Sequence, residues 1–206
     1  MAKARKSVAA RKRSQIAARS AVTRKRRAAG AKAATTRKRK AAARKAVATR
    51  EASVATPGSK TGMLIRRPVH EVFNAFIDPE ITTKFWFTNG TGKLEIGKQV
   101  HWEWTMYGFA IPVTAKVIEP NKRIVIEWPG YQGLTTVEWT FMPLDDGTTF
   151  VRITETGFVG AGDELTKRIA NSTGGFSLVL AGLKALLEHN VMLNLVPDRF
   201  PKGIEE

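Results

Sequence analysis

All the aromatic residues and leucines of this 206-residue chain come after residue 60. Residues 1–56 consist mainly of Ala, Lys and Arg, and they contain no aromatic residue, no Leu and no Pro. Such a segment cannot bury enough apolar surface to offset the conformational entropy that is lost on ordering. We therefore expect a disordered basic tail over residues 1–56 and a folded domain over residues 57–206.

The charge of the chain divides near the same place. Residues 1–60 hold 20 Lys+Arg and one acid, Glu51, for a net charge of +19. Residues 61–206 hold 14 bases and 17 acids, for a net charge of −3. The sequence Ala-Thr-Pro-Gly-Ser at 55–59 marks the boundary, because Pro and Gly interrupt a helix. The sequence thus predicts a mildly acidic domain that carries a very basic tail.

The tail contains a repeat of 13 residues. Arg-Lys-Arg occurs at 11–13, 24–26 and 37–39, and each of the three units ends in Thr. At about 100° per residue, this spacing places successive clusters roughly 140° apart around a helix. A membrane-surface helix would need a stripe of large apolar residues, which the tail lacks. Repeated cationic clusters without such a stripe favour contact with nucleic-acid phosphates and no base readout.

The residues expected to contact DNA or RNA are therefore the basic clusters Arg11, Lys12, Arg13, Arg24, Lys25, Arg26, Arg27, Arg37, Lys38, Arg39 and Lys40. In composition the tail resembles those of linker histones and bacterial histone-like proteins. Three alternatives stay open: a solubilising tail, a nuclear localisation signal formed by residues 24–27 and 37–40, and an organellar transit peptide.

Hydrophobic periodicity predicts an α+β fold for the rest of the chain. Residues 60–67 form a short strand, Pro68 begins a helix, and Asp78 begins a second short helix that runs through Phe87. Period-two alternation and short loops then predict an antiparallel meander. The inward-facing positions of its strands are Val100, Trp102, Trp104 and Met106; Val113, Ala115 and Val117; Ile124, Ile126 and Trp128; Val137, Trp139 and Phe141; and Val151, Ile153 and Glu155.

A long amphipathic helix is expected at the C-terminal end, and it is the one element long enough to cover a face of the sheet. Asp163 is expected to cap this helix, and Gly174-Gly175 invites a kink or a close approach to the sheet. The glycine-rich segment 157–162 lacks the spacing of a dinucleotide-binding loop, and we expect it to form a flexible gate beside a cavity.

Several stretches carry a family resemblance. Residues 68–76 (PVHEVFNAF), Asp78-Pro79-Glu80, Phe85-Trp86 and the helix from Gly174-Gly175-Phe176 to His189 resemble START-like (SRPBCC) proteins. The most similar branch is the homologues of the activator of the 90-kDa heat-shock-protein ATPase, often labelled polyketide-cyclase-like. The resemblance spans about residues 58–200. It implies a helix-grip fold, in which a curved antiparallel sheet and a long C-terminal helix enclose a cavity for apolar or aromatic small molecules.

On this resemblance, the residues expected to line the cavity are aromatic or large and apolar: Trp86, Trp102, Trp104, Trp128, Trp139, Phe141, Phe176 and Leu180. The alternative is that the Trp residues simply fill the core. A face so rich in Trp nonetheless leaves several indole N–H groups that need partners, which a ligand or water can provide. Glu155 is the one carboxylate in phase with the apolar positions of its strand. If it points inward it is a candidate acid/base or polar anchor; the alternative is that the strand has already left the core there.

No other catalytic constellation is present, and the absence of cysteine excludes disulfides and thiol chemistry. The three His residues lack metal-ligand spacing, so we expect neither a metal nor a cofactor. The sequence thus favours a non-enzymatic module that holds a small hydrophobic ligand and is tethered to nucleic acid, in the cytoplasm or nucleoid, or in the nucleus of a eukaryote.

Two alternatives accompany that hypothesis. One is a cyclase- or hydrolase-like enzyme that uses Glu155. The other is a chaperone ATPase co-regulator, as the family name implies; that activator pairs this domain with a separate chaperone-binding domain, which a basic tail cannot replace.

Overall fold

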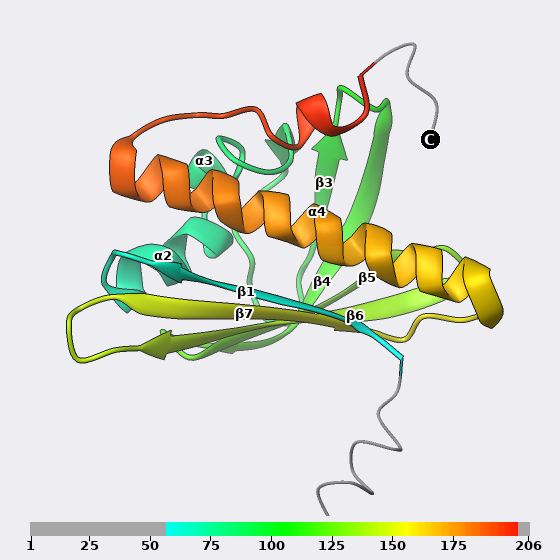
Figure 1. The fold of residues 1–206 in the computed structure, drawn as a ribbon, viewed down its shortest axis with the longest axis horizontal. Coiled ribbons are helices and arrows are strands. Elements are labelled where there is room, and N and C mark those ends of the chain that lie inside the picture. The colour runs from blue at the N-terminus through cyan, green and yellow to red at the C-terminus, as the bar shows by residue number, and fades with distance from the viewer. Residues whose placement is uncertain (1–56, 202–206) are drawn as a thin grey trace, which may run out of the picture. The chain divides into compact units, whose positions relative to one another are not determined.

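A seven-stranded antiparallel sheet organises the part of the chain that the computed structural model describes, residues 57–201 (Figure 1). Its strands lie in the order β1-β7-β6-β5-β4-β3-β2. Their bounds are β1 Ser59–Ile65, β2 Asn89–Gly90, β3 Gln99–Trp104, β4 Phe109–Glu119, β5 Arg123–Gly130, β6 Gly133–Pro143 and β7 Thr149–Thr156. The predicted tail, its repeat and all of its expected nucleic-acid contacts lie outside the described residues.

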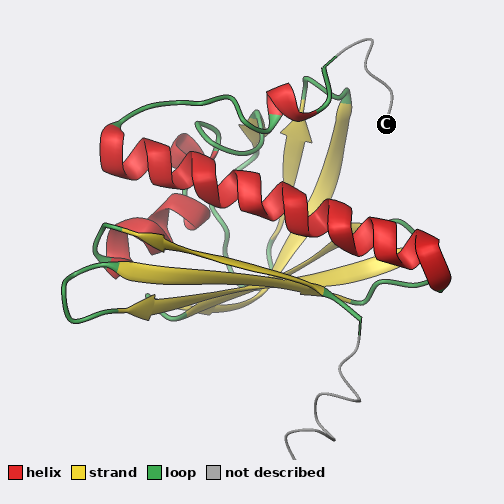
Figure 2. Cartoon of the chain, in the orientation of Figure 1, coloured by secondary structure: helices red, strands yellow, loops and turns green. Residues whose placement is uncertain are grey.

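Two short helices connect β1 to the meander, and one long helix follows it. The short ones are α2 (Val69–Ile77) and α3 (Pro79–Thr82), and the long one is α4 (Gly162–His189). Figure 2 shows α4 lying across the curved sheet. A short 3-10 helix, η1 (Pro197–Arg199), follows near the end of the described chain. The expected helix-grip α+β fold is confirmed. Within residues 57–201, no helix is long and apolar enough to span a membrane.

Helix α3 is shorter than the sequence predicted. It begins where Asp78 accepts a hydrogen bond from the Glu80 N–H at 3.1 Å, but it ends at Thr82. The following residues Phe85, Trp86 and Phe87 are 7%, 6% and 1% exposed. Three consecutive side chains cannot all point to one side of a helix. The prediction of a helix through residue 87 was therefore wrong, because an irregular turn is what lets all three aromatic side chains enter the core.

A β-bulge changes the phase of β4. The pairing of β4 with β5 shifts register between Ala115 and Val117. Beyond this point Ile118 packs against the core, whereas Val117 was the residue predicted to face inward. An extra residue in one strand reverses the alternation that follows it. Strict period-two reasoning fails there for that reason.

The start of α4 also differs from the expectation. The helix begins at Gly162, with Ala161 in the N-cap position and no side-chain capping bond, and Asp163 lies in the first turn. The prediction that Asp163 caps the helix was wrong. Gly160 and Gly162 have φ values of +130° and +61°, so glycines make the turn into the helix. Asp163 still places negative charge near the positive end of the helix dipole.

The C-terminal half of α4 is tied to the segment that follows β1. The Arg66 N–H donates to Glu188 Oε1 at 2.7 Å, and the Lys184 ammonium group donates to the same oxygen at 2.5 Å. Burial raises the pKa of Glu188, but these two hydrogen bonds and the charges of Lys184 and Arg66 outweigh it, so the pKa lies below the ordinary value of 4.5. The carboxylate thereby joins the two ends of the domain sequence.

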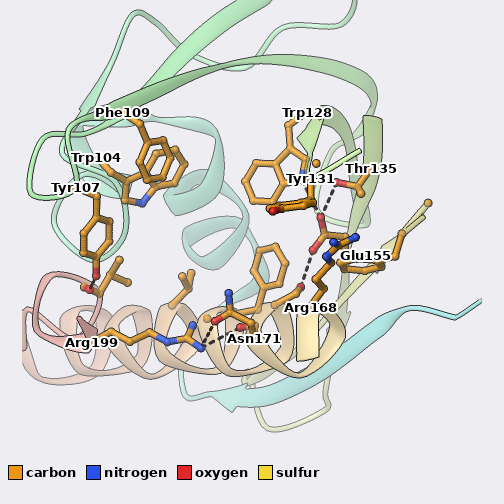
Figure 3. Close-up of a pocket in the computed structure, with 18 of the residues that line it drawn as sticks. Trp104, Tyr107, Phe109, Trp128, Tyr131, Thr135, Glu155, Arg168, Asn171 and Arg199 are labelled. Atoms are coloured by element: carbon orange, nitrogen blue, oxygen red, sulfur yellow. Dashed lines mark hydrogen bonds between the residues drawn. The ribbon is translucent and has the colours of Figure 1, made fainter. Parts of the chain in front are cut away.

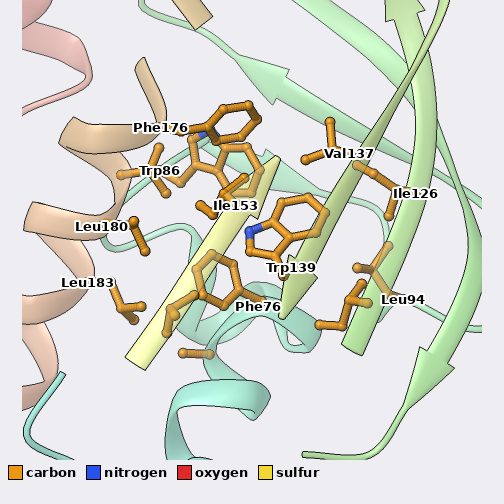
Figure 4. Packing of buried hydrophobic residues seen from close by; sticks show 14 of the residues in the cluster. Phe76, Trp86, Leu94, Ile126, Val137, Trp139, Ile153, Phe176, Leu180 and Leu183 are labelled. Carbon is orange, nitrogen blue, oxygen red and sulfur yellow. The ribbon is translucent and has the colours of Figure 1, made fainter. Parts of the chain in front are cut away.

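The core lies between α4, α2 and the inner face of the sheet (Figure 4). Ile153 and Trp139 on the sheet and Leu180 and Leu183 on α4 are each at most 1% exposed. This confirms the predicted inward phase of β6, β7 and α4 at these positions. Phe76 of α2 joins the cluster, with its ring centroid 5.7 Å from that of Trp139.

Candidate functional site

A cavity of about 370 Å³ lies between α4 and the curved sheet (Figure 3). Its walls come from the β3–β4 turn region, the β5–β6 hairpin, the end of β7, the segment 157–159, α4 and residues 196–200. A volume of this size is typical of sites for small organic molecules. The same helix that closes the core therefore also closes one side of a cavity.

The eight residues predicted to line the cavity separate into two groups. Trp86, Trp104, Trp128 and Phe176 line it. The other four lie in the hydrophobic core and do not line the cavity. They are Trp102 (2% exposed), Trp139 (1%), Phe141 (4%) and Leu180 (0%). The Trp-rich face of the sheet therefore lines the cavity in one part and fills the core in another.

The lining aromatic rings form two stacked pairs. The rings of Trp128 and Phe176 are 5.9 Å apart at 17°, and those of Trp104 and Phe109 are 5.2 Å apart at 22°. Phe109 is 47% exposed and Tyr131 is 81% exposed, so apolar surface continues to the cavity mouth. Exposed aromatic surface around a cavity is typical of a binding site. These flat faces suit a planar or aromatic ligand.

Glu155 points inward and lies in the wall of the cavity, with a residual exposure of 5%. Its Oε1 accepts hydrogen bonds from Trp128 Nε1 at 2.9 Å and from Thr135 Oγ1 at 2.6 Å. Its Oε2 accepts from Ser172 Oγ at 2.5 Å. The Ser59 hydroxyl oxygen is 2.8 Å from that of Ser172. Since a hydroxyl has one proton, Ser59 donates to Ser172 when Ser172 donates to Glu155.

These bonds come from three separate parts of the fold. Trp128 and Thr135 are cross-strand partners on β5 and β6, whereas Ser172 is on α4. A carboxylate offers about four acceptor positions, and three are used here. Glu155 is therefore a fixed carboxylate with capacity for about one more donor, which a ligand hydroxyl or amine can supply.

One indole N–H stands apart from this arrangement. Among the described residues, Trp139 Nε1 is the one buried side-chain nitrogen or oxygen without a hydrogen-bond partner. The sequence predicted that indole N–H groups of this face would need partners. For Trp128 that partner is Glu155, but Trp139 lies outside the cavity wall, so a cavity ligand does not contact it directly.

Sequence reasoning did not find the polar residues on the α4 side of the cavity. Arg168, Asn171 and Ser172 line it, as does Gly175. Their spacing of three and four residues places them on one face of the helix. That spacing was a usable signal, but the apolar stripe of the same helix was the stronger pattern and obscured it.

The C-terminal segment also contributes a residue that had no local signal, Arg199. Its Nη2 donates to the main-chain oxygen of Asn171 at 3.1 Å and to Asn171 Oδ1 at 2.6 Å. Cβ atoms built on Gly174 and Gly175 would lie 3.0 and 2.8 Å from its guanidinium nitrogens. Helix α4 continues through these glycines without a break. The close approach is made by the Arg199 side chain and not by the sheet.

Residues 190–201 run back over α4 to reach this position (Figure 1). The Tyr107 hydroxyl donates to the Val196 carbonyl, and the rings of Tyr107 and Phe200 lie 5.9 Å apart. Burial raises the pKa of Tyr107 above its ordinary value of 10.0, although a hydrogen bond with the main chain of Phe200 and the Arg199 charge oppose this rise. The segment therefore forms part of the cavity wall.

The glycine-rich segment lies beside the cavity, as expected. Gly157, Phe158 and Val159 line it, and Gly157 has a φ of +91°. A Cβ at Gly157 would lie 3.0 Å from the Leu134 carbonyl oxygen, so a side chain there would strain the wall. Whether this segment opens as a gate stays a prediction.

The three histidines lie apart from this site. His70, His101 and His189 are all exposed. Within residues 57–201, no group of three or more His, Cys, Asp or Glu side chains is arranged to hold a metal ion.

The family profile described as Activator of Hsp90 ATPase homolog 1-like protein matches residues 66–188, more than half of the chain. No curated protein shows a significant match to the sequence. Among solved structures, protein SSP2350 from Staphylococcus saprophyticus is 28% identical, with a TM-score of 0.57, over 66% of this chain and 95% of its own.

Two further solved structures are similar at 18% identity. The Aha1 protein of Colwellia psychrerythraea, determined as a dimer, has a TM-score of 0.55 over 64% of this chain and 96% of its own. DynU16, a protein of the dynemicin biosynthetic locus, has a TM-score of 0.58 over 66% of this chain and 49% of its own. At this identity the likeness concerns the fold alone.

Proposed function

Because the chain belongs to the Activator of Hsp90 ATPase homolog 1-like family, we propose that its folded domain binds a small apolar molecule in the cavity beneath α4. The observation that carries this proposal is the cavity itself, about 370 Å³ in volume and walled by Trp86, Trp104, Trp128 and Phe176. Burial of an apolar body against these rings would remove both surfaces from water. Glu155 would then fix the orientation of a ligand hydroxyl or amine.

Titration with an uncharged apolar fluorophore, N-phenyl-1-naphthylamine, tests this function. All five Trp residues of the chain lie between residues 86 and 139, so energy transfer from Trp to the probe reports binding at the folded domain. We expect saturable binding at one probe per chain and a rise in thermal stability with probe concentration. The absence of both for N-phenyl-1-naphthylamine and for a panel of planar apolar compounds would refute the proposal.

Two α4 substitutions separate binding from stability. Phe176→Ala removes a ring that lines the cavity, and Leu183→Ala removes a buried side chain that does not. Since an aromatic pair contributes about 0.5–1.5 kcal/mol, Phe176→Ala should weaken probe binding about 2- to 10-fold. Leu183→Ala should destabilise the fold while leaving probe affinity of the folded protein unchanged.

For the tail we propose sequence-independent binding to the phosphate backbone of DNA or RNA. The support is the net charge of +19 over residues 1–60 and the Arg-Lys-Arg cluster at every thirteenth residue. Contact with about a dozen phosphates gives a slope near −10 for log K against log salt. On this proposal the protein would reside with the nucleic acid of the cell, whether cytoplasmic, nucleoid-associated or nuclear.

Gel-shift titrations against salt test the tail. The full chain is compared with a variant in which the three Arg-Lys-Arg clusters are changed to Gln-Gln-Gln. We expect the variant to lose affinity on every DNA sequence and to show a shallower salt slope, because nine of the phosphate contacts lose their charge. Equal binding by both proteins, or binding that salt does not weaken, would overturn this part of the proposal.

A cyclase- or hydrolase-like activity is the second candidate, and the position of Glu155 favours it. It is the one carboxylate in the cavity wall among residues 57–201. Glu155→Gln keeps the size of the side chain and removes its ability to take up a proton. Turnover of a cavity ligand that Glu155→Gln leaves unchanged would exclude this residue as an acid or base.

Co-regulation of a chaperone ATPase is the third candidate, and its support is the name of the family. A chaperone ATPase assay with added protein tests it directly. Stimulation would favour this function over simple ligand binding, and unchanged ATPase activity would reject it.

A further inference from the structure

The cavity wall contains two arginines that form no ion pair. Within residues 57–201, neither Arg168 nor Arg199 has a carboxylate oxygen within 4.0 Å of its guanidinium nitrogens. Both side chains are only partly exposed, and both line the cavity. A guanidinium group is always charged, so the cavity wall carries more positive than negative charge.

The guanidinium group of Arg168 already contacts residues at the cavity mouth. Its guanidinium carbon lies 4.0 Å from the centre of the Tyr131 ring, and its Nη1 donates to the Val159 carbonyl at 3.0 Å. In Figure 3 it lies on the same side of the cavity as Glu155. An anionic group placed there would approach the Glu155 carboxylate, which opposes its binding.

Arg199 lies on the other side of the cavity in Figure 3, with its guanidinium carbon 4.9 Å from the centre of the Phe200 ring. Its two hydrogen bonds both come from Nη2, so no acceptor among the described residues uses Nη1 or Nε. Because Gly174 and Gly175 have no Cβ atom, the guanidinium group can lie directly against the backbone of α4. The group is thus fixed in place while part of its donor set stays free.

Asn171 adds neutral donors beside this charge. Its Oδ1 accepts from Arg199, which determines which end of the amide is oxygen and which is nitrogen. The Nδ2 group therefore presents its two N–H donors elsewhere, and among residues 57–201 no acceptor takes them. Asn171 itself lines the cavity. A guanidinium and an amide N–H group side by side are a suitable pair for an oxyanion.

We propose that the cavity takes an amphiphilic ligand: an aromatic body against Trp104, Phe109, Trp128 and Phe176, with an anionic oxygen group, such as a carboxylate or sulfonate, bound by Arg199 and Asn171. This inference rests on the proposed ligand-binding function and specifies the class of ligand. The donors Nη1 and Nε of Arg199 and Nδ2 of Asn171 match the acceptor oxygens of such a group. The Glu155 end of the cavity takes the uncharged part.

A pair of probes that differ in one charged group tests the inference in the full chain. These are 1-anilinonaphthalene-8-sulfonate and the uncharged N-phenyl-1-naphthylamine. Arg199→Gln should weaken binding of the sulfonate about tenfold, since it removes charge-assisted hydrogen bonds, and should change binding of the neutral probe less than twofold. Arg199→Lys should retain part of the sulfonate affinity because it keeps the charge.

Arg152→Gln provides the matched control. Arg152 lies on β7 and outside the cavity wall, with its guanidinium carbon 5.9 Å from the centre of the Phe150 ring. Arg152→Gln removes the same charge as Arg199→Gln but at a position outside the cavity wall, so it should leave the affinities for both probes unchanged. Binding of the sulfonate probe to the basic tail is the same in all variants. Energy transfer from Trp detects only the probe that is bound at the folded domain.

Binding of the neutral probe together with sulfonate binding that Arg199→Gln does not alter would overturn the inference and leave the proposed function standing. An equal loss of affinity for both probes would also overturn it, because the arginine would then act only through the shape of the wall. If neither probe binds the unaltered protein, the proposed function fails and the inference fails with it.

Discussion

Gly175→Ala is expected to show directly that the Arg199 guanidinium rests on α4. A Cβ built at residue 175 lies 2.8 Å from Arg199 Nη1, and no other atom outside the helix backbone and the neighbouring residues lies within 4 Å. Real Cβ atoms do not approach so closely, so one group must move. The backbone of α4 is held along 28 residues, whereas the guanidinium ends a flexible side chain. We therefore expect Arg199 to be displaced.

Two opposing effects set the size of the change. Alanine in a helix interior is more favourable than glycine by about 1 kcal/mol. Displacing Arg199 loses its two hydrogen bonds to Asn171, at 2.6 and 3.1 Å, which contribute roughly 0.5–1.5 kcal/mol each. With Arg199 present, the effect of Gly175→Ala on the free energy of unfolding should therefore lie between zero and a destabilisation of about 2 kcal/mol. In an Arg199→Ala background the full gain of about 1 kcal/mol should appear.

Urea unfolding of the four proteins in this double-mutant cycle measures the coupling, which is expected to be about 1–3 kcal/mol. Gly182→Ala serves as the control, because its Cβ would meet Phe85, 3.2 Å from its carbonyl oxygen, and not Arg199. It should show the same effect with and without Arg199. If Gly175→Ala also has the same effect in both backgrounds, within about 0.5 kcal/mol, the reasoning is refuted.

Three further outcomes are expected. Leu183→Ala should lower the free energy of unfolding by about 2–5 kcal/mol in urea titrations, because the side chain is fully buried. Thr135→Val should lower the free energy of unfolding by about 1.5–3 kcal/mol, because the buried Glu155 carboxylate loses a hydrogen-bond donor at 2.6 Å. An effect below about 0.5 kcal/mol would show that another donor replaces this bond. The pKa of Glu188 is lowered in the fold, so the stability that this carboxylate contributes is present above pH 4.5 and is lost as pH falls through its folded pKa. The difference in free energy of unfolding between the unaltered protein and Glu188→Gln should therefore shrink on acidification. A difference that stays constant with pH would contradict the assignment.

Outside the β4 bulge, alternation along the strands predicted which residues point inward, because side chains of a strand alternate between its two faces. It could not separate core from cavity wall. Trp128 and Trp139 lie on neighbouring strands with the same inward phase, yet Trp128 lines the cavity and Trp139 is 1% exposed within the core. The difference depends on where α4 crosses the sheet, which no local pattern specifies.

Local errors in the prediction have local physical causes. The bulge in β4 places Ile118 against the core in place of Val117. The helix expected through Phe87 ends at Thr82, because burial of three consecutive aromatic side chains overrides helix propensity. In both cases tertiary packing selected a backbone that the periodicity of the sequence does not encode.

By itself, the sequence determined that the net positive charge lies in residues 1–60 and the aromatic residues and leucines after them, and that Glu155 shares the phase of the core positions. Only the tertiary structure decided what Glu155 and Arg199 contact. Glu155 receives donors from β5, β6 and α4, and Arg199 meets Asn171, 28 residues earlier in the chain. Periodicity reports the face on which a side chain lies, whereas such contacts depend on the path of the whole chain.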